Sequence, residues 1–422
     1  MDIKFSYFCQ KYPWKEKEEI RYNTGSGPGR RGGKSGVRPS RPYAAKRGDI
    51  VETEKLTEDK EIIIGQKERD RTGEKRPRRR DFRYLLSGGI CLAAAAALLA
   101  AARKLPGFAD WYTVHIYPLW VGLVGRIFGF LPFSAAEIGM YLLIAGAAFY
   151  LVRHWRRPLR IAGRAVFLAG ILLLSYSLNC GINYYCVPFS SYLAYGTEGR
   201  TVEELEELCR YLAEKANEYA DCAGQGLTPE EYAQEGIRAM TALGEEYSRL
   251  SGYYPRPKYL TVPWILSVQQ LAGIYSPFTV EANYNNAMIS YNIPHTICHE
   301  LSHLKGFMRE DEANFIGFLA CLESERREFL YSGYVMGWIY AGNALAAADP
   351  ESYVQVRELL KEEIQADLEA NNRFWDQYEG KVAEVAEAVN DTYLKANDQE
   401  HGVASYGMVV DLMLAWFEET VK

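Results

Sequence analysis

The sequence predicts a mainly α-helical membrane protein, in which three transmembrane helices precede a mostly helical domain with a small extended or β element. Three observations predict this fold class. Long apolar runs occupy residues 85–180, helical periodicity dominates residues 181–422, and one aromatic and β-branched stretch within that domain lacks the periodicity. The chain is therefore expected to divide into a tail, a membrane region and a domain.

The three parts also differ in charge. Residues 1–84 hold 23 Lys and Arg against 14 Asp and Glu, residues 85–164 hold 8 against 2, and residues 165–422 hold 17 against 38. The overall charge of −6 therefore averages two basic segments with an acidic one. Its sign argues against a nucleic-acid partner, and eight cysteines in 422 residues exclude a small disulfide-stabilised fold.

Residues 1–84 are expected to form a disordered, basic cytoplasmic tail. They show no sustained helical or strand period, and residues 23–36 consist largely of Gly, Ser, Pro and Arg. A segment this polar cannot bury enough apolar surface to offset the entropy that it would lose on ordering. Its last basic cluster, residues 78–83, directly precedes an apolar run, where basic residues hold the cytoplasmic end of a membrane helix.

Three apolar runs are expected to cross the bilayer, near residues 85–102, 135–152 and 161–180. The first has 18 residues and no charge, and each of the others has one charge near its start. At about 1.5 Å per residue, such runs traverse most of a bilayer core. The lipid bilayer is therefore a predicted partner, and the aromatic connection at residues 103–134 is expected to lie at its outer interface.

Basic residues orient these spans. Arginines precede the first run, and Arg153, Arg156, Arg157 and Arg160 fill the short loop between the second and the third. Both places are expected on the cytoplasmic side, which an up-down-up path satisfies. Residues 181–422 are then predicted to be an extracytoplasmic domain of a multi-pass plasma-membrane protein.

The domain shows clear helix signals and one exception. Thr201 and Thr228 each begin the pattern of a helix-capping box. Residues 274–292 lack helical period and are expected to be irregular or extended, with the next helix beginning at Pro294. Longer helical patterns are expected over three ranges, residues 310–347, 350–394 and 405–421.

The clearest chemical signal is the motif HExxH, which residues 299–303 form as His-Glu-Leu-Ser-His. On a helix, residues four apart lie on one face, so the imidazoles of His299 and His303 can reach one ion. Glu300 then projects toward the open side of the metal. Simple frequencies give on the order of 0.01 chance matches in a chain with so few histidines. The motif therefore predicts a zinc site.

A catalytic zinc takes three protein ligands and keeps its fourth position open. The next predicted helix offers two candidates, Glu310 and Glu312. Glu310 is favoured because Asn314 lies four residues later on the same face, where its amide can orient a ligating histidine. Glu312 lies two residues further round the helix and stays the alternative ligand.

HExxH followed by Glu-x-x-Ala-Asn resembles the gluzincin metallopeptidases, in which the third ligand is a Glu on the following helix. The similarity to a second group, the bacterial membrane family catalogued as domain of unknown function 3810, covers roughly residues 85–420. It is carried by residues 276–283, 299–303, 309–315, 393–397 and 402–406. Val280 occupies a position where glycine is expected in that family. The resemblance implies a zincin-like peptidase domain and does not indicate its substrate.

These residues predict a membrane-anchored zinc peptidase that hydrolyses peptide or protein substrates outside the cytoplasm. His299, His303 and Glu310 would hold Zn²⁺, whose charge lowers the pKa of a bound water toward neutrality. Glu300 would take the proton of that water as it attacks the carbonyl and would deliver it to the leaving amine. Both proton transfers, from the water and to the amine, require the Glu300 carboxyl to reach the open side of the metal.

Further features leave alternatives open. The oxyanion needs a donor besides zinc, and Tyr406 is the chosen candidate, with Tyr393 and His401 as alternatives. The extended piece at residues 275–283 either pairs with a peptide as an added strand or serves only as structure. A second functional class is a non-catalytic membrane sensor or scaffold with structural zinc. The intact Glu300 favours the enzyme, because a structural site has no use for a base beside the metal.

His295 completes a row with the two histidines of the motif. Three ligands in one straight row cannot surround one tetrahedral ion, so His295 is expected in the first turn of the helix or at the rim of the site. Two cysteine pairs, Cys180 with Cys186 and Cys209 with Cys222, are candidates for disulfides outside the membrane. The sequence establishes neither pairing.

Overall fold

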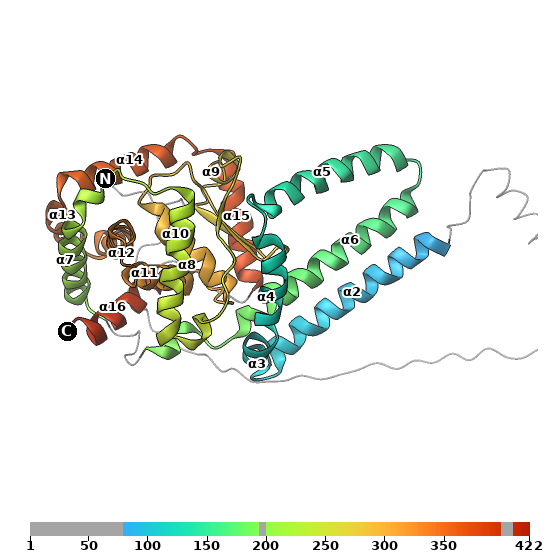
Figure 1. The fold of residues 1–422 in the computed structure, drawn as a ribbon, viewed down its shortest axis with the longest axis horizontal. Helices are drawn as coiled ribbons and strands as arrows, with labels where there is room; N and C mark the ends of the chain where they lie inside the picture. Colours follow the sequence, from blue (N-terminus) through green and yellow to red (C-terminus); the bar gives the residue numbers. More distant parts are fainter. Residues whose placement is uncertain (1–78, 194–199, 398–407) are drawn as a thin grey trace, which may run out of the picture.

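The computed structural model describes residues 79–193, 200–397 and 408–422. Within them the chain is mainly helical with one small sheet, and Figure 1 shows a helical domain from which three long helices extend to one side. Most of the predicted tail lies outside the described residues. Its boundary is corrected at one point, because the first described helix already begins at Arg79 and so includes the last residues assigned to the tail.

Three helices are long and apolar enough to cross a membrane, as the apolar runs predict. They are α2 (Arg79–Lys104), α5 (Ala135–His154) and α6 (Pro158–Asn179). The protein is therefore membrane-associated. The helices are longer than the predicted runs because each continues from its apolar stretch into flanking charged or polar residues.

The helices α2 and α6 pack closely against each other through glycines. A Cβ atom on Gly170 would lie 2.6 Å from the carbonyl oxygen of Gly88, so only glycine permits this approach of the two backbones. At the end remote from the domain, Asp81 of α2 lies 3.4 Å from Arg160 and 3.3 Å from Arg164, both of α6. The pair thus forms one unit along its length.

The helix α5 is attached in a different way. Within this fully described helix, Glu137 in the first turn is the only buried residue. Its carboxylate accepts hydrogen bonds from the backbone N–H groups of Thr261 (2.7 Å) and Val262 (2.9 Å). Figure 1 shows that α5 adjoins the domain at this first turn and meets α6 at the opposite end. The remaining length of α5 is largely exposed, apart from its far end, where Arg164 of α6 lies over the ring of Tyr150.

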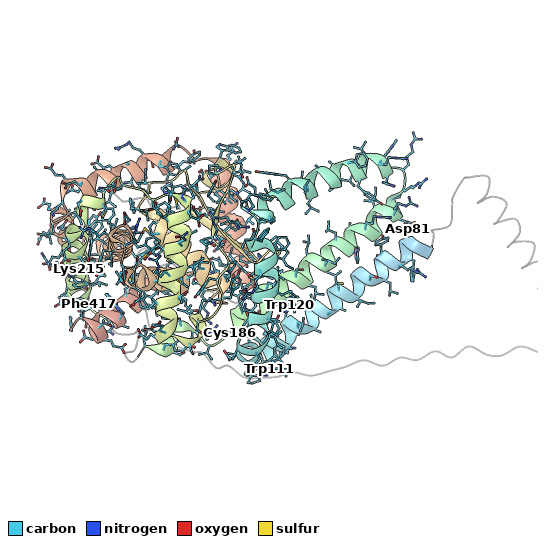
Figure 2. The ribbon with its side chains drawn as sticks, in the orientation of Figure 1. Asp81, Trp111, Trp120, Cys186, Lys215 and Phe417 are labelled. Atoms are coloured by element: carbon cyan, nitrogen blue, oxygen red, sulfur yellow. The ribbon has the colours of Figure 1, made fainter. Side chains whose placement is uncertain are left out.

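Two short helices lie between the spans and the domain, α3 (Phe108–His115) and α4 (Tyr117–Gly129). Figure 2 shows Trp111 and Trp120 at this end of the long helices, with Asp81 at the opposite end. Tryptophan is enriched where a bilayer meets water. The aromatic connection therefore lies between the three long helices and the domain.

The domain contains ten described α-helices and four 3₁₀ helices. The α-helices are α7 (Val202–Glu218), α8 (Pro229–Glu246), α9 (Trp264–Ser267), α10 (Asn292–Leu304), α11 (Glu310–Leu322), α12 (Arg327–Ala348), α13 (Pro350–Glu358), α14 (Glu362–Asp376), α15 (Lys381–Ala396) and α16 (Val409–Thr420). The 3₁₀ helices are η1 (Gly181–Tyr185), η2 (Phe189–Tyr192), η3 (Ala220–Cys222) and η4 (Ser248–Leu250). Both predicted capping boxes are present, at the starts of α7 and α8.

Two predicted helices are wrong in length. The pattern at residues 310–347 is divided into α11 and α12, because the Ser324 hydroxyl accepts the backbone N–H of Arg326 and donates to the buried Glu235, which favours a turn. The pattern at residues 350–394 is divided into α13, α14 and α15. Gly380 precedes α15 with a φ of 149°, a conformation that a helix interior does not allow.

The centre of the domain is α10, which is buried along almost its whole length. It packs against α8, α11, α12 and the sheet. This position explains its composition, because apolar side chains such as Ile297 and Leu301 fill the core on one side. The histidines and the acidic residue of the motif lie on the remaining surface of the same helix.

The sheet has three strands, β1 (Lys258–Tyr259), β2 (Gly273–Ser276) and β3 (Glu281–Tyr284). The central strand β3 is parallel to β1 and antiparallel to β2, with Ile274 opposite Asn283. The expectation of an extended segment at residues 274–292 is therefore confirmed for its first part. The edge strand β2 also packs against α10.

A buried ion pair joins this sheet to the membrane region. Nζ of Lys258 lies 2.6 Å from Oε1 of Glu281, and the two side chains are 3% and 1% exposed. Lys258 also donates to the carbonyl of Phe128 at the end of α4 (2.7 Å). Glu281 accepts the N–H groups of Ala135 (3.1 Å) and Ala136 (2.8 Å) at the start of α5. One ion pair thus holds both α4 and α5 against the sheet.

Val280 lies in the turn between β2 and β3 with a φ of 52°, in the left-handed region. A β-branched residue is strained there, while glycine is not. The side chain of Val280 is fully buried, so replacing it with either glycine or alanine removes apolar contacts of the same kind. We expect Val280→Gly to be more stable than Val280→Ala by about 1 kcal/mol, because the left-handed conformation penalises any Cβ. Denaturation of the detergent-solubilised protein measures this difference.

A matched pair at Val335 serves as the control, because this valine is equally buried but helical, within α12. There the order should reverse, with the alanine variant more stable by about 1 kcal/mol. If alanine is the better replacement at both positions, the backbone at Val280 is not strained.

Candidate metal centre

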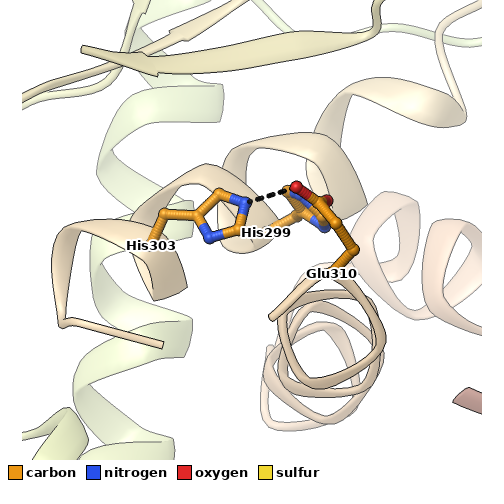
Figure 3. A group of neighbouring side chains, drawn as sticks. All are labelled: His299, His303 and Glu310. Carbon is orange, nitrogen blue, oxygen red and sulfur yellow. Dashed lines mark ion pairs between the residues drawn. The ribbon is translucent and has the colours of Figure 1, made fainter. Parts of the chain in front are cut away.

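Three side chains of the ligand type come together between α10 and α11. His299 and His303 lie one turn apart on α10, and Glu310 is the first residue of α11. One ligand atom of each lies within 4.8 Å of the others. Figure 3 shows Glu310 directed from the start of α11 toward both imidazoles. Gly306, with a φ of 91°, ends α10 and turns the chain back toward α11, which brings Glu310 into place.

The spacing of these atoms is close to that of the ligands of a tetrahedral metal ion. Nε2 of His299 lies 3.3 Å from Oε2 of Glu310, and Nε2 of His303 lies 3.8 Å from Oε1. Ligands placed about 2.0–2.2 Å from a zinc ion in tetrahedral geometry are separated by about 3.3–3.6 Å. Two imidazoles and one carboxylate also form a donor set that catalytic zinc sites use, with the fourth position open. The residues therefore fit zinc.

Hydrogen bonding fixes the orientation of His303. Its Nδ1 lies 2.7 Å from the carbonyl oxygen of Phe307, which can only accept, so Nδ1 carries a proton and Nε2 faces Glu310. Burial alone would lower the pKa of His303, but the Glu310 carboxylate raises this pKa to about 9. Burial conversely raises the pKa of Glu310, and the two imidazoles more than offset this and hold it well below its usual range. Glu310 is therefore an ionised ligand.

Glu300 lies on the same helix, beside the histidine pair. It is buried, and its Oε2 atom has no hydrogen-bond partner among the described residues. Burial raises the pKa of this carboxyl to about 7. A carboxyl group with a pKa near neutrality can both accept and donate a proton at physiological pH.

The edge strand β2 covers Glu300 through Gly273. A Cβ atom on Gly273 would lie 2.5 Å from Oε1 of Glu300, so only glycine leaves space for the carboxyl. No sequence motif distinguishes Gly273. The residue directly precedes an aromatic and β-branched stretch, but nothing in that pattern indicates which helix the strand will contact.

The structure corrects the expectations for Glu312 and Asn314. The Glu312 carboxylate does not join the cluster and instead accepts the backbone N–H of Phe189 (2.9 Å). The side-chain nitrogen of Asn314 is buried without a hydrogen-bond partner among the described residues, and the backbone carbonyl of Asn314 contacts His295, which is not one of the three clustered residues. The carbonyl of Phe307 orients His303 instead. Helical spacing alone could not predict this contact, because it forms in the loop after α10.

His295 lies in the first turn of α10, as predicted. Its Nε2 is 3.0 Å from the carbonyl oxygen of Asn314, which requires a protonated Nε2. Burial, together with the neighbouring His299, lowers the pKa of His295 to about 3. His295 is thus a neutral residue held by α11, outside the group of three ligand atoms.

Tyr406 and His401 lie outside the described residues. The third candidate for an oxyanion donor, Tyr393 of α15, is described and lines the same cavity as Glu300. Its hydroxyl lies 3.1 Å from that of Tyr184, and burial raises its pKa far above the usual range. Tyr393 is therefore a protonated hydroxyl in the cavity.

The cavity beside the cluster has a volume of about 330 Å³. Its walls come from the segment after α6, from β2, α10, α11 and α15. Cys180 also lines it as a free thiol, and no disulfide joins Cys180 to Cys186 or Cys209 to Cys222. The site therefore combines a candidate metal centre, a buried carboxyl and a tyrosine hydroxyl around one space.

The fold and the site define a membrane-associated helical protein with a candidate metal centre of two histidines and one glutamate. A family model described as "Protein of unknown function (DUF3810)" matches residues 112–414, and the chain belongs to this family. The comparison with curated proteins gives no match, and neither does the comparison with solved structures. The match confirms the resemblance to the family of domain of unknown function 3810, and the description of that family names no activity.

Proposed function

We propose that the protein is a membrane-anchored, zinc-dependent peptidase with a gluzincin-like site. The observation that carries the proposal is the cluster of His299, His303 and Glu310 with the buried carboxyl of Glu300 beside it. A purely structural metal site gains nothing from a buried carboxyl with one oxygen left without a hydrogen-bond partner among the described residues, because such a group costs free energy to desolvate. A hydrolase needs such a group as a base.

The three ligand side chains would hold Zn²⁺, which would supply a coordinated water of lowered pKa and polarise the substrate carbonyl. Glu300 accepts a proton as water adds to the scissile carbonyl, and it passes that proton to the amine as the C–N bond breaks. Tyr393 is positioned in the cavity to donate a hydrogen bond to the developing oxyanion.

The edge strand β2 is suited to bind the substrate backbone. Among the strands of the described residues it pairs with β3 alone, and Gly273, Ile274 and Tyr275 of β2 line the cavity. An extended peptide can add to such an edge through main-chain hydrogen bonds. This mode would place the peptide across Glu300, which lies directly beneath Gly273.

The proposed topology has the tail in the cytoplasm and the domain on the outer side. The arginine-rich loop between α5 and α6 lies at the end of the spans remote from the domain, as does the start of α2 (Figure 1). Basic loops are retained in the cytoplasm. A cysteine introduced at the exposed Gln225 should react with a membrane-impermeant maleimide in intact cells. Protection at this position until the cells are permeabilised would reverse the orientation.

The central test measures metal content and peptide cleavage together. The purified protein should hold about one zinc ion per chain and cleave members of a random peptide library. Chelation with 1,10-phenanthroline should remove both zinc and cleavage, and added Zn²⁺ should restore both. A zinc-loaded protein that cleaves no peptide would instead support the sensor or scaffold with structural zinc.

The two glutamates at the start of α11 should differ sharply in their effect on metal binding. We expect Glu310→Gln to weaken zinc affinity by more than the 10- to 100-fold that loss of an outer partner of a ligand causes, because it removes a ligand. Glu312→Gln should keep the affinity, since its carboxylate contacts the N–H of Phe189. Competition with a zinc-binding dye measures both variants. Equal loss in the two would contradict the assignment of Glu310.

A further inference from the structure

The candidate site lies at the end of a membrane span. Asn179 is the last residue of α6, and Cys180, the next residue, lines the cavity. Tyr184 follows one turn later and lines it as well. No linker therefore separates the span from the site. The cavity begins where the helix leaves the bilayer.

Three chain segments at or near the cavity are hydrogen-bonded to the ends of spans. Asn179 of α6 donates to the carbonyl of Pro277 in the turn after β2 (2.8 Å). Tyr176, in the last turn of α6, donates to the side chain of Asn397 beyond α15 (2.8 Å). Glu137 at the start of α5 accepts the N–H of Val262, just before α9. The β2–β3 turn, α15 and α9 thus lie at the level where α5 and α6 leave the membrane.

These same segments expose large apolar side chains, which we call the apolar rim. Its members are 40–63% exposed in the structure. They are Val262, Trp264, Ile274, Phe278, Val385 and Val389. Figure 1 shows α9 and α15 on the side of the domain from which the spans extend. Large apolar side chains exposed on one side of a domain mark an interaction site, and the hydrogen bonds that tie their segments to the ends of α5 and α6 identify the lipid bilayer as the occupant.

The apolar rim borders the mouth of the cavity. Ile274 of β2 lines the cavity and is 45% exposed, so it belongs to both. Val389 directly precedes Asn390, another lining residue on α15. A rim that contacts lipid therefore places the cavity mouth at the bilayer surface. A chain that reaches the site from there must itself emerge from the membrane.

We propose that the substrate is a membrane-anchored polypeptide, which is cleaved within the few residues that follow its anchor. This inference rests on the proposed peptidase function and specifies its substrate class. Such a segment emerges at the level of β2 and can pair with this edge strand directly. A soluble polypeptide would have to reach the cavity past the apolar rim, which is in contact with lipid.

The first test concerns lipid contact and does not depend on activity. A photo-crosslinking amino acid is placed at Trp264 or Val385 in the full-length protein, which is reconstituted in vesicles of phosphatidylethanolamine and phosphatidylglycerol. Lipid adducts are expected at both positions. The control is Val354, which is 54% exposed. It belongs to α13, a helix on the side of the domain away from the spans (Figure 1). Absence of adducts at both rim positions, or equal adducts at Val354, would overturn the inference.

The second test varies the distance between the anchor and the scissile sequence. One peptide library is presented free, or in the same vesicles behind a leucine-rich transmembrane helix with a spacer of two or thirty residues. We expect the short-spacer form to be cleaved at least about 10-fold faster than the free form, as tethering raises the effective concentration. We also expect it to be cleaved faster than the long-spacer form, since thirty residues reach up to about 100 Å from the surface.

The outcomes separate the two proposals. Faster cleavage of the long-spacer form, or equal cleavage of the free and anchored forms, would overturn the proposal of a membrane-proximal substrate. The proposed peptidase function would stand in either case. Trp264→Glu should slow cleavage of the short-spacer form and spare the free form, while Val354→Glu should affect neither. Cleavage of no form by the zinc-loaded protein contradicts the peptidase itself, and the lipid adducts then decide whether the apolar rim meets the bilayer.

Discussion

We expect Glu300→Gln to lower kcat/KM for peptide cleavage by about 10²- to 10⁴-fold, the usual contribution of a general acid–base group. Gln has the same shape and cannot accept the proton of the attacking water. The variant should stay folded and keep its zinc, because Glu300 is outside the group of three ligand atoms. Cleavage of a library-derived peptide, measured beside zinc content, provides the comparison.

Glu312→Gln is the matched control for this experiment. Glu312 is also a buried carboxyl close to the site, and burial together with the neighbouring Asp311 raises its pKa above the usual range. It contacts the backbone of Phe189 and does not line the cavity. Its replacement should therefore leave cleavage unchanged. Full activity in Glu300→Gln would sink the proposed mechanism.

Lys258→Met should destabilise the protein by about 3–5 kcal/mol, the cost of leaving a buried charge without its partner. Glu281 is almost fully buried, so it cannot recover the lost interaction from water. The double variant Lys258→Met/Glu281→Gln should regain much of this stability, because it removes both charges and keeps an acceptor for the first turn of α5. Denaturant unfolding in detergent micelles measures both variants.

A surface pair gives the reference for this prediction. Lys215 lies 2.8 Å from Glu218, but both side chains are substantially exposed. Lys215→Met should therefore cost less than about 1 kcal/mol, the upper range for exposed pairs. If Lys258→Met costs no more than Lys215→Met, the buried pair does not stabilise the junction between sheet and span.

The sequence predicts those features that depend on local pattern. The three apolar helices follow from length and hydropathy alone, and the capping boxes at Thr201 and Thr228 follow from residues three positions apart. The approach of Glu310 to His299 and His303 is also local in origin. One helix, one tight turn at Gly306 and one further helix bring the three side chains together.

Features that depend on distant segments could not be predicted in this way. The contact of Gly273 with Glu300 requires knowledge of where β2 packs. The hydrogen bond from Phe189 to Glu312 joins residues more than a hundred positions apart. The break of the long helical pattern at Ser324 likewise depends on the buried Glu235, which α8 supplies. In each case a residue of another, distant element determines a contact or a helix end that the local sequence pattern does not specify.

The attachment of α5 links the candidate site to the thickness of the bilayer. The first turn of this helix is held against the domain by Glu281 and Glu137, while at its far end Arg164 of α6 lies over the ring of Tyr150. A membrane helix adapts to a thicker or thinner bilayer by changing its tilt. For α5 such a change pivots at the sheet, so the torque reaches β3 first and then its neighbour β2. Because β2 covers Glu300, membranes of different thickness load the strand that lies over the candidate base.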